Sequence, residues 1–332
     1  MKKTVSSDEK IAFLFPGQGS QYVGMGRDLC EHFKVARQTF EEADEALQFK
    51  ISTLCFEGPW KDLTLTTNTQ PAILTVSISA LRVLQSETGL SPILLAGHSL
   101  GEYSALVAGD AIDFADAVRV VRARGQFIQD AVPARKGGLG VVLGLDEVAL
   151  KSVCREAAQG EIVTLANYNC PGQIAISGHL GAVRRAISLA KERGAKGAAL
   201  LPVSAPIHSP LMKPAGEQLG EVLSCINMND AYIPVISNVD ARPHTSRIKI
   251  KQLLVQHVSV PVRWEESMRT MLSQSIRRFI EIGPGKVLSG LVKWINPDVA
   301  LANVEDMVSL QGIKSLHNLP KVVICGPGCA NP

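Results

Sequence analysis

The sequence predicts an α/β fold with a parallel sheet and a smaller inserted unit, and three observations lead to this. Short apolar strands alternate with longer helical segments along most of the 332 residues, an order typical of a parallel sheet covered by helices on both faces. A Gly-x-Ser-x-Gly motif follows one strand and begins a helix. Between residues 139 and 203 the order changes to β-α-β-β-α-β, the split pattern of a ferredoxin-like unit.

Composition places the chain among ordinary globular proteins, with 46% hydrophobic and 20% charged residues. The net charge of +3 is too small to indicate a nucleic-acid partner, and no basic run is interleaved with aromatic residues. No apolar run is long enough to span a bilayer, and residues 1–10 lack the apolar core of a signal peptide. We therefore expect a cytoplasmic protein without a membrane partner. A removed transit peptide, for a plastid or a mitochondrion, is left open.

The cysteines give no sign of a metal site. Seven are scattered along the chain and no Cys-x-x-Cys occurs. Cys325 and Cys329 are close, but no histidine or second pair completes a zinc site. We expect reduced thiols and no metal.

The first strand, at 11–15, ends in the loop Pro16-Gly17-Gln18-Gly19-Ser20-Gln21. Glycines directly after a strand let the backbone approach a ligand closely. The loop lacks the Lys-Ser/Thr of a P-loop and the spacing of a dinucleotide site, so we reject both. A loop that gives one backbone N–H to an oxyanion is the better interpretation, and a plain strand-to-helix turn is the alternative.

Helical periodicity predicts helices at 25–47, 71–88 and 113–130, with a loop at 56–68. The third helix carries Arg119, Arg122 and Arg124 among valines. On periodicity alone, arginines on a helix favour a solvated face.

The strand at 93–96 leads into Gly97-His98-Ser99-Leu100-Gly101 and a helix at 100–108. Strand, sharp turn and helix are the context of a nucleophile elbow, where flanking glycines let the backbone turn tightly. The Ser99 hydroxyl would lie over the N-terminus of the next helix, whose free N–H groups stabilise a developing oxyanion. The alternative is a serine that only caps this helix.

A linker at 133–138 precedes the ferredoxin-like pattern. Its strands are predicted at 139–143, 162–167, 173–177 and 197–203, and its helices at 146–158 and 181–193. We therefore expect a discontinuous large domain, 1–132 and 204–332, with a small domain, 133–203, inserted into it.

The rest of the chain returns to the large domain. Helices are predicted at 211–225, 248–257, 263–275 and from 287, and strands at 233–237 and 278–282. Sites in such a sheet lie at the carboxyl ends of the strands, where the Gln18 loop, Ser99, His208 and Gly283 all fall. From 305 we predict one weak helix, and no structure for the tail that contains Val322-Val323-Ile324.

A serine nucleophile needs a base. His98 adjoins Ser99, so its side chain cannot easily fold back onto the hydroxyl. His208 lies just past a strand end between Pro206 and Pro210, which present it from a rigid loop. It is the best candidate for the base, and an ordinary loop histidine is the alternative.

Four motifs occur in order: FPGQGSQ at 15–21, GHSLGEYSAL at 97–106, PIHSPLM at 206–212 and EIGPG at 281–285. Together they resemble the malonyl-CoA:acyl carrier protein transacylase family, the acyltransferases of fatty-acid synthesis. The resemblance runs from residue 11 to residue 310 and is specific because several separated motifs agree.

This resemblance implies an α/β-hydrolase-like large domain with a ferredoxin-like insert, and no bound cofactor. Ser99 would attack the malonyl thioester of coenzyme A with His208 as base, and the phosphopantetheine thiol of acyl carrier protein would then take the malonyl group. The backbone N–H groups of Gln18 and Leu100 would form the oxyanion hole. Arg124 would grip the free malonyl carboxylate, which a planar guanidinium binds bidentately.

Two departures from the family concern the site. The family orients its histidine through a backbone carbonyl, usually of a Gln a few residues before Pro-Val-x-Trp, but this chain holds one extra residue there. The carbonyl belongs to Gln256 or His257, and we choose Gln256. Ile207 stands before the histidine, where relatives often have Phe or Ser near the acyl α-carbon. A bulky apolar residue there favours malonyl over methylmalonyl.

The implied partners are malonyl-CoA and an acidic acyl carrier protein that binds transiently, and we expect a monomer. Basic residues of both domains could form a landing surface for the carrier, with a solvated helix face as the alternative. These are Arg184, Arg185, Lys191, Arg193, Lys196, Lys286 and Lys293. The sequence does not separate fatty-acid from polyketide synthesis.

Two other functions stay open. A thioesterase or esterase shares the elbow and the base, but it normally adds an Asp or Glu between them in chain order, and no motif marks one. A non-catalytic docking protein on the same fold is the second. Intact Ser99, His208 and Arg124 speak against it.

Overall fold

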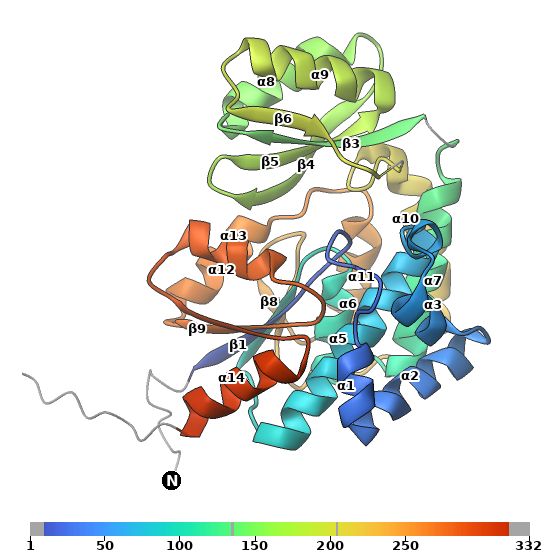
Figure 1. Cartoon of the computed structure of the whole chain (residues 1–332). Coiled ribbons are helices and arrows are strands. Elements are labelled where there is room, and N and C mark those ends of the chain that lie inside the picture. The colour runs from blue at the N-terminus through green and yellow to red at the C-terminus, as the bar shows by residue number, and fades with distance from the viewer. Residues whose placement is uncertain (1–9, 134–135, 204, 319–332) are drawn as a thin grey trace, which may run out of the picture.

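A six-stranded sheet forms the centre of the larger part of the molecule (Figure 1). The computed structural model describes residues 10–133, 136–203 and 205–318. The strand order is β10-β9-β1-β2-β7-β8, and every pairing is parallel except that of β7 with β8. The α/β class and the parallel sheet are confirmed. The strands are β1 (Ile11–Phe15), β2 (Leu94–Gly97), β7 (Val235–Ile236), β8 (Pro243–His244), β9 (Arg278–Ile282) and β10 (Ala300–Val304).

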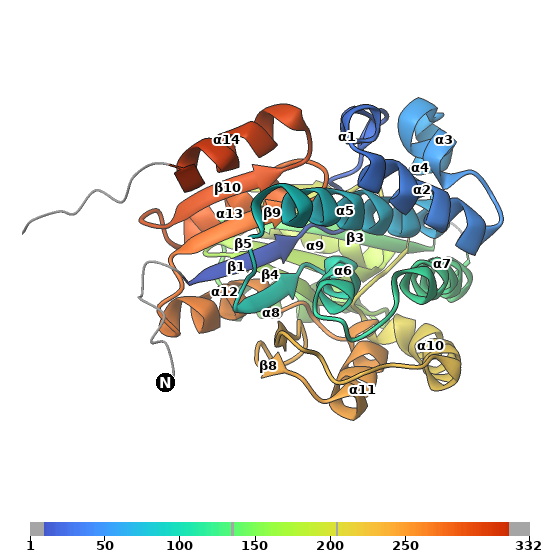
Figure 2. The same cartoon turned by 90° about the horizontal axis from the view of Figure 1, so that it is seen from below.

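Both faces of this sheet are apolar because helices cover both. On β1, Phe13 and Phe15 belong to the core beneath α5 (Thr66–Thr88) and α7 (Phe114–Asp130). Ala12 and Leu14 belong to a second core with α12 (Trp264–Ser273) and α13 (Val287–Ile295). Alternate residues of a strand face opposite sides, so one short strand contributes to two cores. Figure 2 shows α5 over the strands, with α2 (Lys34–Leu47) and α7 beside it.

The N-terminal helices differ from the prediction in two places. The single helix predicted at 25–47 is two helices, α1 (Arg27–His32) and α2, because Phe33 is extended, with φ −121° and ψ 126°. The loop predicted at 56–68 instead contains the end of α3 (Ile51–Glu57), α4 (Trp60–Leu63) and the first residues of α5. Pro71 lies inside α5, which is buried over most of its length. Burial outweighs the weak helix propensity of the Thr- and Asn-rich first turn.

The other helices follow the prediction more closely. They are α6 (Gly101–Ala108), α10 (Lys213–Cys225), α11 (Arg247–His257) and α14 (Met307–Asn318), and a 3₁₀ turn at Pro210–Met212 precedes α10. Two short outer strands with little apolar alternation, β8 and β10, were not predicted. The tail with Val322-Val323-Ile324 lies outside the described residues.

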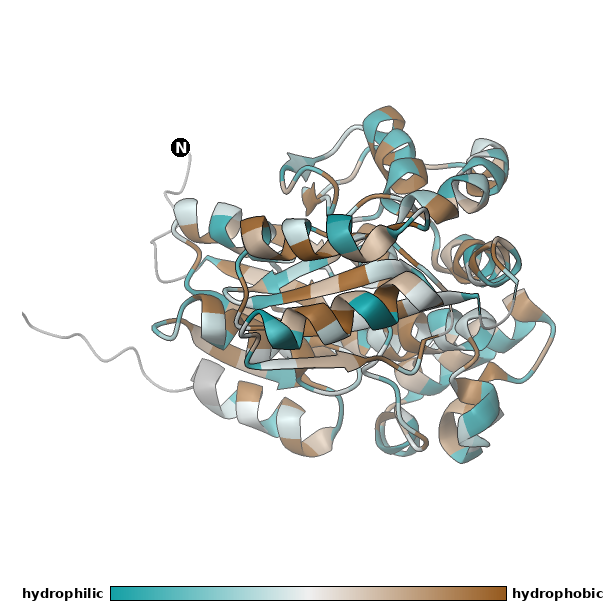
Figure 3. Cartoon of the chain, turned by 90° about the horizontal axis from the view of Figure 1, so that it is seen from above, coloured by the Kyte–Doolittle hydropathy of each residue, from teal (hydrophilic) through white to brown (hydrophobic). Residues whose placement is uncertain are grey.

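A separate antiparallel sheet carries the ferredoxin-like pattern, at the top of Figure 1. Its strands are β3 (Gly137–Leu143), β4 (Val163–Cys170), β5 (Gln173–His179) and β6 (Gly197–Leu200), in the order β4-β5-β3-β6. The helices α8 (Glu147–Ala158) and α9 (Leu180–Glu192) pack against one face of it. Figure 3 shows hydrophobic and hydrophilic bands alternating along these helices. The ferredoxin-like insert is confirmed.

The domain boundaries themselves, at 132/133 and 203/204, stay a prediction, since residues 134–135 and 204 lie outside the described residues. No helix in the described ranges is long and apolar enough to cross a membrane.

Candidate active site

Ser99 lies on the tight turn between β2 and α6, at the carboxyl end of the sheet. Its φ is 51°, a left-handed conformation that is uncommon for a residue with a side chain. A Cβ on Gly97 would overlap the backbone of Gly101, and a Cβ on Gly101 would overlap the carbonyl of Phe15. Both glycines are therefore needed for the turn to pack against β1. The turn leaves Ser99 only 8% exposed.

The buried ring of His208 meets this serine. The Nε2 atom lies 2.7 Å from Ser99 Oγ, and the Nδ1 atom lies 2.9 Å from the carbonyl oxygen of His257. A carbonyl only accepts, so Nδ1 carries a proton and Nε2 of the neutral ring accepts from the serine hydroxyl. Burial, with the nearby charge of Arg124, lowers the pKa of His208 to about 3. The ring is therefore neutral near pH 7 and able to accept a proton.

The carbonyl that faces His208 belongs to His257, so the choice of Gln256 was wrong. The carbonyl of Gln256 instead accepts from the backbone N–H of Ser259 at 3.0 Å. His257 is the last residue of α11, and the carbonyls of a last helical turn have no partner within the helix. The carbonyl of His257 is thus free to bind a side chain outside the helix.

Arg124 points inward from α7, and its guanidinium is buried. Nη1 donates to Gln70 Oε1 at 2.8 Å, and Nη2 lies 3.5 Å from Ser99 Oγ. The guanidinium also lies 5.7 Å from the ring centroid of Tyr103. Within the described residues Nε has no hydrogen-bond partner. Burial lowers the pKa of this arginine, yet a guanidinium stays charged at pH 7. A buried cation whose Nε–H donor is unused among the described residues therefore lies beside the candidate nucleophile.

The two amides expected to bind an oxyanion lie beside this serine. The Gln18 loop packs closely on the elbow. A Cβ on Gly17 would overlap the carbonyl of His98, so only glycine fits there. The Ser99 amide donates to Asn238 Oδ1 at 2.7 Å, so it is already occupied. In the part of the chain that the structure describes, neither the Gln18 nor the Leu100 amide donates to another protein group. Both amides are thus available for a ligand.

A cavity of about 260 Å³ opens in front of Ser99 and His208, between the two sheets. The hydrogen bond from His98 Nε2 to Asn169 Oδ1, 2.9 Å long, joins the elbow to β4 across it. The loop after β1, the small sheet, the segment before His208 and α13 complete its lining, among them Gln18, Leu139, Val141, Asn167, Ala175, Ile207, Leu288 and Leu291.

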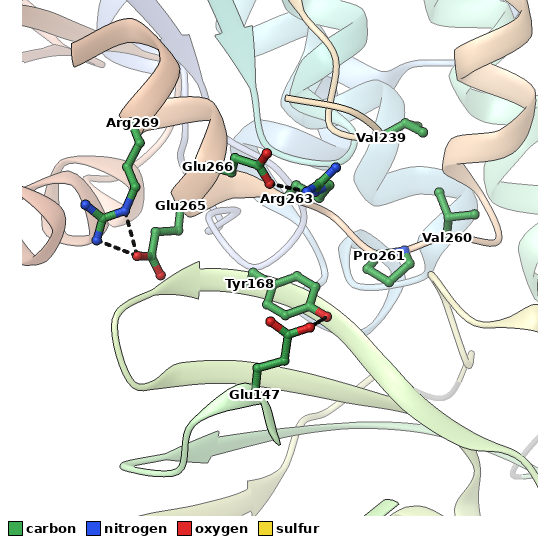
Figure 4. Close-up of a pocket in the computed structure, with 9 residues that line it drawn as sticks. All are labelled: Glu147, Tyr168, Val239, Val260, Pro261, Arg263, Glu265, Glu266 and Arg269. Atoms are coloured by element: carbon green, nitrogen blue, oxygen red, sulfur yellow. Dashed lines mark hydrogen bonds and ion pairs between the residues drawn. The ribbon is translucent and has the colours of Figure 1, made fainter. Parts of the chain in front are cut away.

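A larger cavity, of about 570 Å³, lies between β4 and α12 (Figure 4). Its charged residues are already paired: Arg263 with Glu266 and Arg269 with Glu265. Tyr168 donates to Glu147 at 3.0 Å. Among the residues that the structure describes, those that line this cavity include no serine, cysteine or histidine. The smaller cavity is therefore the candidate active site.

Three buried residues near the site were missed by the sequence analysis: Gln70, Glu102 and Asn238. Asn238 follows β7 at the carboxyl end of the sheet, and that position was the signal that could have identified it. Gln70 lies between the loop predicted at 56–68 and the helix predicted at 71–88, where nothing in the sequence marked it.

The described part of the chain contains no cluster of three His, Cys, Asp or Glu residues that could hold a metal. Its five cysteines are free thiols, whereas Cys325 and Cys329 lie outside the described residues. The expectation of an enzyme without metal or bound cofactor stays a prediction.

Comparisons with known proteins agree on one family. Residues 12–305 match the model of the acyl transferase domain. The malonyl CoA-acyl carrier protein transacylase of Bacillus subtilis (strain 168) is 52% identical over 303 residues, which cover 91% of this chain and 95% of that protein. The protein of the same name from Escherichia coli (strain K12) is 46% identical over 286 residues, covering 86% and 93%.

Solved structures give the same result. An acyl carrier protein S-malonyltransferase from Vibrio cholerae O1 biovar eltor matches with a TM-score of 0.89 at 47% identity, covering 92% of this chain and 99% of that one. A malonyl-transacylase in complex with a type II PKS acyl-carrier protein matches with a TM-score of 0.90 at 44% identity, covering 93% and 99%.

Proposed function

This chain belongs to the acyl transferase domain family, and we propose that it moves a malonyl group from coenzyme A to acyl carrier protein through a malonyl-serine at Ser99. The observation that carries the proposal is one triad of atoms. His208 Nε2 lies 2.7 Å from Ser99 Oγ, and the guanidinium of Arg124 lies 3.5 Å from the same oxygen. A base and an anion-binding cation therefore converge on one nucleophile.

The first half-reaction loads the enzyme. Ser99 Oγ attacks the thioester carbonyl of malonyl-CoA, and its proton passes to His208 Nε2. The oxyanion accepts hydrogen bonds from the Gln18 and Leu100 amides. When the carbon–sulfur bond breaks, His208 returns the proton to the leaving sulfur and coenzyme A departs as its thiol.

The second half-reaction reverses these roles. The phosphopantetheine thiol of acyl carrier protein gives its proton to His208, and its sulfur attacks the malonyl-serine carbonyl. The carbon–oxygen bond breaks and Ser99 recovers the proton. The carbonyl of His257, 2.9 Å from His208 Nδ1, keeps the ring in the tautomer that both steps need.

Arg124 supplies the preference for a charged acyl chain. A malonyl group carries a free carboxylate, and a buried guanidinium binds such a group with two parallel hydrogen bonds. The bulky apolar side chain of Ile207 lines the same cavity. It occupies space that the added methyl group of a methylmalonyl chain would need. We therefore propose malonyl rather than methylmalonyl as the substrate.

The wider setting is proposed on the same basis. The relatives at 46–52% identity are named malonyl CoA-acyl carrier protein transacylases. We place the activity in fatty-acid synthesis, with type II polyketide synthesis as the second candidate, because one structural neighbour was solved with such a carrier. A cytoplasmic monomer that meets its carrier transiently is the form we propose.

The direct test is to incubate the protein with malonyl-CoA in the absence of acceptor and to measure its intact mass, with Ser99→Ala as the control. We expect a stable gain of one malonyl group that is absent in the control and is discharged by acyl carrier protein. Free malonate without an adduct would identify a hydrolase instead. Neither adduct nor turnover would indicate a non-catalytic protein or another acyl donor.

A further inference from the structure

A buried polar cluster that this mechanism does not use lies behind Ser99 and His208. It consists of Glu102 on α6, Asn238 after β7 and the side chain of His257 at the end of α11. A buried carboxyl group is costly to ionise unless partners compensate it. Its partners here therefore indicate what this carboxyl group does.

Glu102 is connected to the nucleophile through Asn238. The backbone N–H of Asn238 donates to Glu102 Oε2 at 2.9 Å. The side chain of Asn238 spans the elbow: Nδ2 donates to the carbonyl of Gly97, and Oδ1 accepts from the amide of Ser99, each at 2.7 Å. Glu102 thus fixes the residue that holds the backbone of Ser99 in its left-handed conformation.

Glu102 also faces the ring that lies against the base. Its Oε2 atom is 3.4 Å from His257 Nδ1. Among the described residues neither ring nitrogen of His257 has a hydrogen-bond partner. The ring stacks on that of His208, with centroids 5.1 Å apart and 25° between the planes. His257 therefore contacts the base with its side chain as well as with its carbonyl.

The charges around this cluster explain why a carboxylate matters here. When His208 takes the proton of Ser99, it becomes a buried cation close to Arg124. The other titratable groups that interact electrostatically with Glu102 or His257 are Tyr103, His98 and Asp240. Burial raises the pKa of Glu102 to about 8 and lowers that of His257. As the pH rises, Glu102 is the member of the cluster that becomes negative.

We propose that Glu102 and the imidazole of His257 are positioning residues for the acylation of Ser99. The carboxyl group holds the elbow through Asn238, and across the ring of His257 it supplies the negative charge that compensates the proton on His208. This rests on the proposed function. Neither residue exchanges a proton with the substrate: the Ser99 proton goes to His208 Nε2 and then to coenzyme A. Acylation is therefore faster when Glu102 is ionised.

The test is single-turnover acylation of Ser99 by excess malonyl-CoA, followed by intact mass from about pH 6 to about pH 9.5. It compares the wild type with Glu102→Gln, His257→Gln and the control Ser104→Ala. Ser104 is a buried residue of the same helix whose hydroxyl has no hydrogen-bond partner in the described chain. Thermal unfolding of each variant, at the same pH values, reports the folded fraction.

We expect the wild-type rate to rise about tenfold with a midpoint near pH 8. Glu102→Gln keeps an oxygen for the Asn238 amide but cannot ionise, so it should stay at the low rate. His257→Gln keeps the backbone carbonyl and should reduce the rise to about threefold or less. Ser104→Ala should keep the wild-type profile. A purely structural role would change the folded fraction without changing the profile of the folded enzyme.

A wild-type rate that does not vary with pH, or an unchanged rise in folded Glu102→Gln, would overturn the inference while leaving the transacylase intact. If Glu102→Gln does not fold, His257→Gln decides, and an unchanged profile there overturns the inference. The absence of malonyl-serine in the wild type at every pH would overturn the proposed function and this inference together.

Discussion

Ser99 and His208 meet because each occupies a backbone conformation that few residues with side chains adopt. Their φ angles are 51° and 60°, in the left-handed region. Such positions persist only where surrounding contacts hold them, and they concentrate at functional sites. Ser99 is held by the hydrogen bond from its amide to Asn238 Oδ1. His208 is held by the hydrogen bond from its amide to the carbonyl of Val258, 3.1 Å long.

His208→Ala should slow the acylation of Ser99 by about 10²–10⁴-fold, the usual contribution of a general base. The matched control is His32→Ala, an exposed histidine on α1. Single-turnover acylation, followed by intact mass, measures the rate of each variant. A rate near that of the wild type in folded His208→Ala would assign the base to another residue.

The pH dependence of the same step follows from burial. The folded pKa of His208 is about 3, well below its ordinary value, so the ring binds a proton only in strong acid. Between about pH 5 and pH 7 it is already neutral, so the His208 ring itself should cause no fall in the acylation rate as the pH is lowered through that range, and folded Glu102→Gln should keep a constant rate there. A loss of rate with a midpoint near pH 6.5 would show that the ring titrates like an exposed histidine.

Arg124→Ala should reduce acylation by malonyl-CoA by about 100-fold and make acetyl-CoA relatively better, because the buried partner of the acyl carboxylate is gone. Arg119→Ala is the control on the same helix, since Arg119 is exposed and paired with Asp116 at 2.9 Å. The measurement is the ratio of kcat/KM for the two thioesters. An unchanged ratio in Arg124→Ala would remove this residue from the acyl site.

Residue-level prediction was most specific where chemistry restricts a position to one residue type. The elbow motif singled out Ser99 as the candidate nucleophile, and the two prolines around His208 singled out the candidate base; the structure brings these two side chains together. Arg124 was selected only by resemblance, since helical periodicity favours a solvated face. The carbonyl was misplaced from His257 to Gln256 because the choice followed the residue type usual in the family, whereas any residue offers the same backbone carbonyl and the extra residue before Pro261 left two positions open. Glu102 and Asn238 were missed because their contacts join residues more than 130 positions apart.

At the scale of elements, the elbow depends on how closely α6 approaches β1 and β2. Gly97→Ala would place a methyl group into the backbone of α6, and it should destabilise the fold by about 3 kcal/mol and abolish acylation. Gly290→Ala is the control, because a Cβ on that glycine of α13 meets nothing within 4 Å. The control should gain about 0.5–1 kcal/mol, since alanine is the better helix former. Urea unfolding measures both changes, and a neutral Gly97→Ala would contradict the packing.

Elements with a strong apolar period were predicted well, and elements fixed by tertiary contacts were not. The six elements of the insert were recognised from their alternating order. α5 was begun five residues late because a proline usually marks a helix start. In the structure, packing against α2 and α7 carries the helix through Pro71. β10 pairs with β9 at an outer edge, and its short Ala-Leu-Ala-Asn-Val segment carries no clear strand signal.

At the scale of the whole molecule, the candidate active cavity lies between the mainly parallel sheet and the antiparallel sheet. The parallel sheet presents Ser99 at its carboxyl edge, and the small sheet closes the cavity with the face that α8 and α9 leave uncovered. Leu139, Val141 and Ala175 line the cavity, while Val142, Ile174 and Ile176 pack against these helices. Alternation along β3 and β5 therefore separates the ligand face from the helix-covered face.

This arrangement restricts where an acidic carrier can dock. Of the basic residues considered above, Arg185 donates to the carbonyls of Ala157 and Ala158 and pairs with Glu161, so it supports the small domain itself. Arg184 is exposed on α9, on the side of the small sheet away from the cavity. Lys286 is exposed and adjoins Val287, which lines the cavity. Because the carrier thiol has to reach Ser99 in the proposed reaction, we expect the carrier to dock at α13 and the adjoining Lys286 rather than on α9.

Lys286→Glu combined with Lys293→Glu should therefore raise the KM for acyl carrier protein by about fivefold or more, because charges at a rim mainly speed encounter with an oppositely charged partner. Acylation by malonyl-CoA in the absence of carrier should change little, and so should transfer to a small thiol such as pantetheine. Arg184→Glu is the matched reversal on α9 and should leave all three measurements near those of the wild type. A carrier KM that responds to Arg184→Glu and not to the reversals at Lys286 and Lys293 would place the carrier on the small domain, and its prosthetic group would then have to enter the cavity past β6.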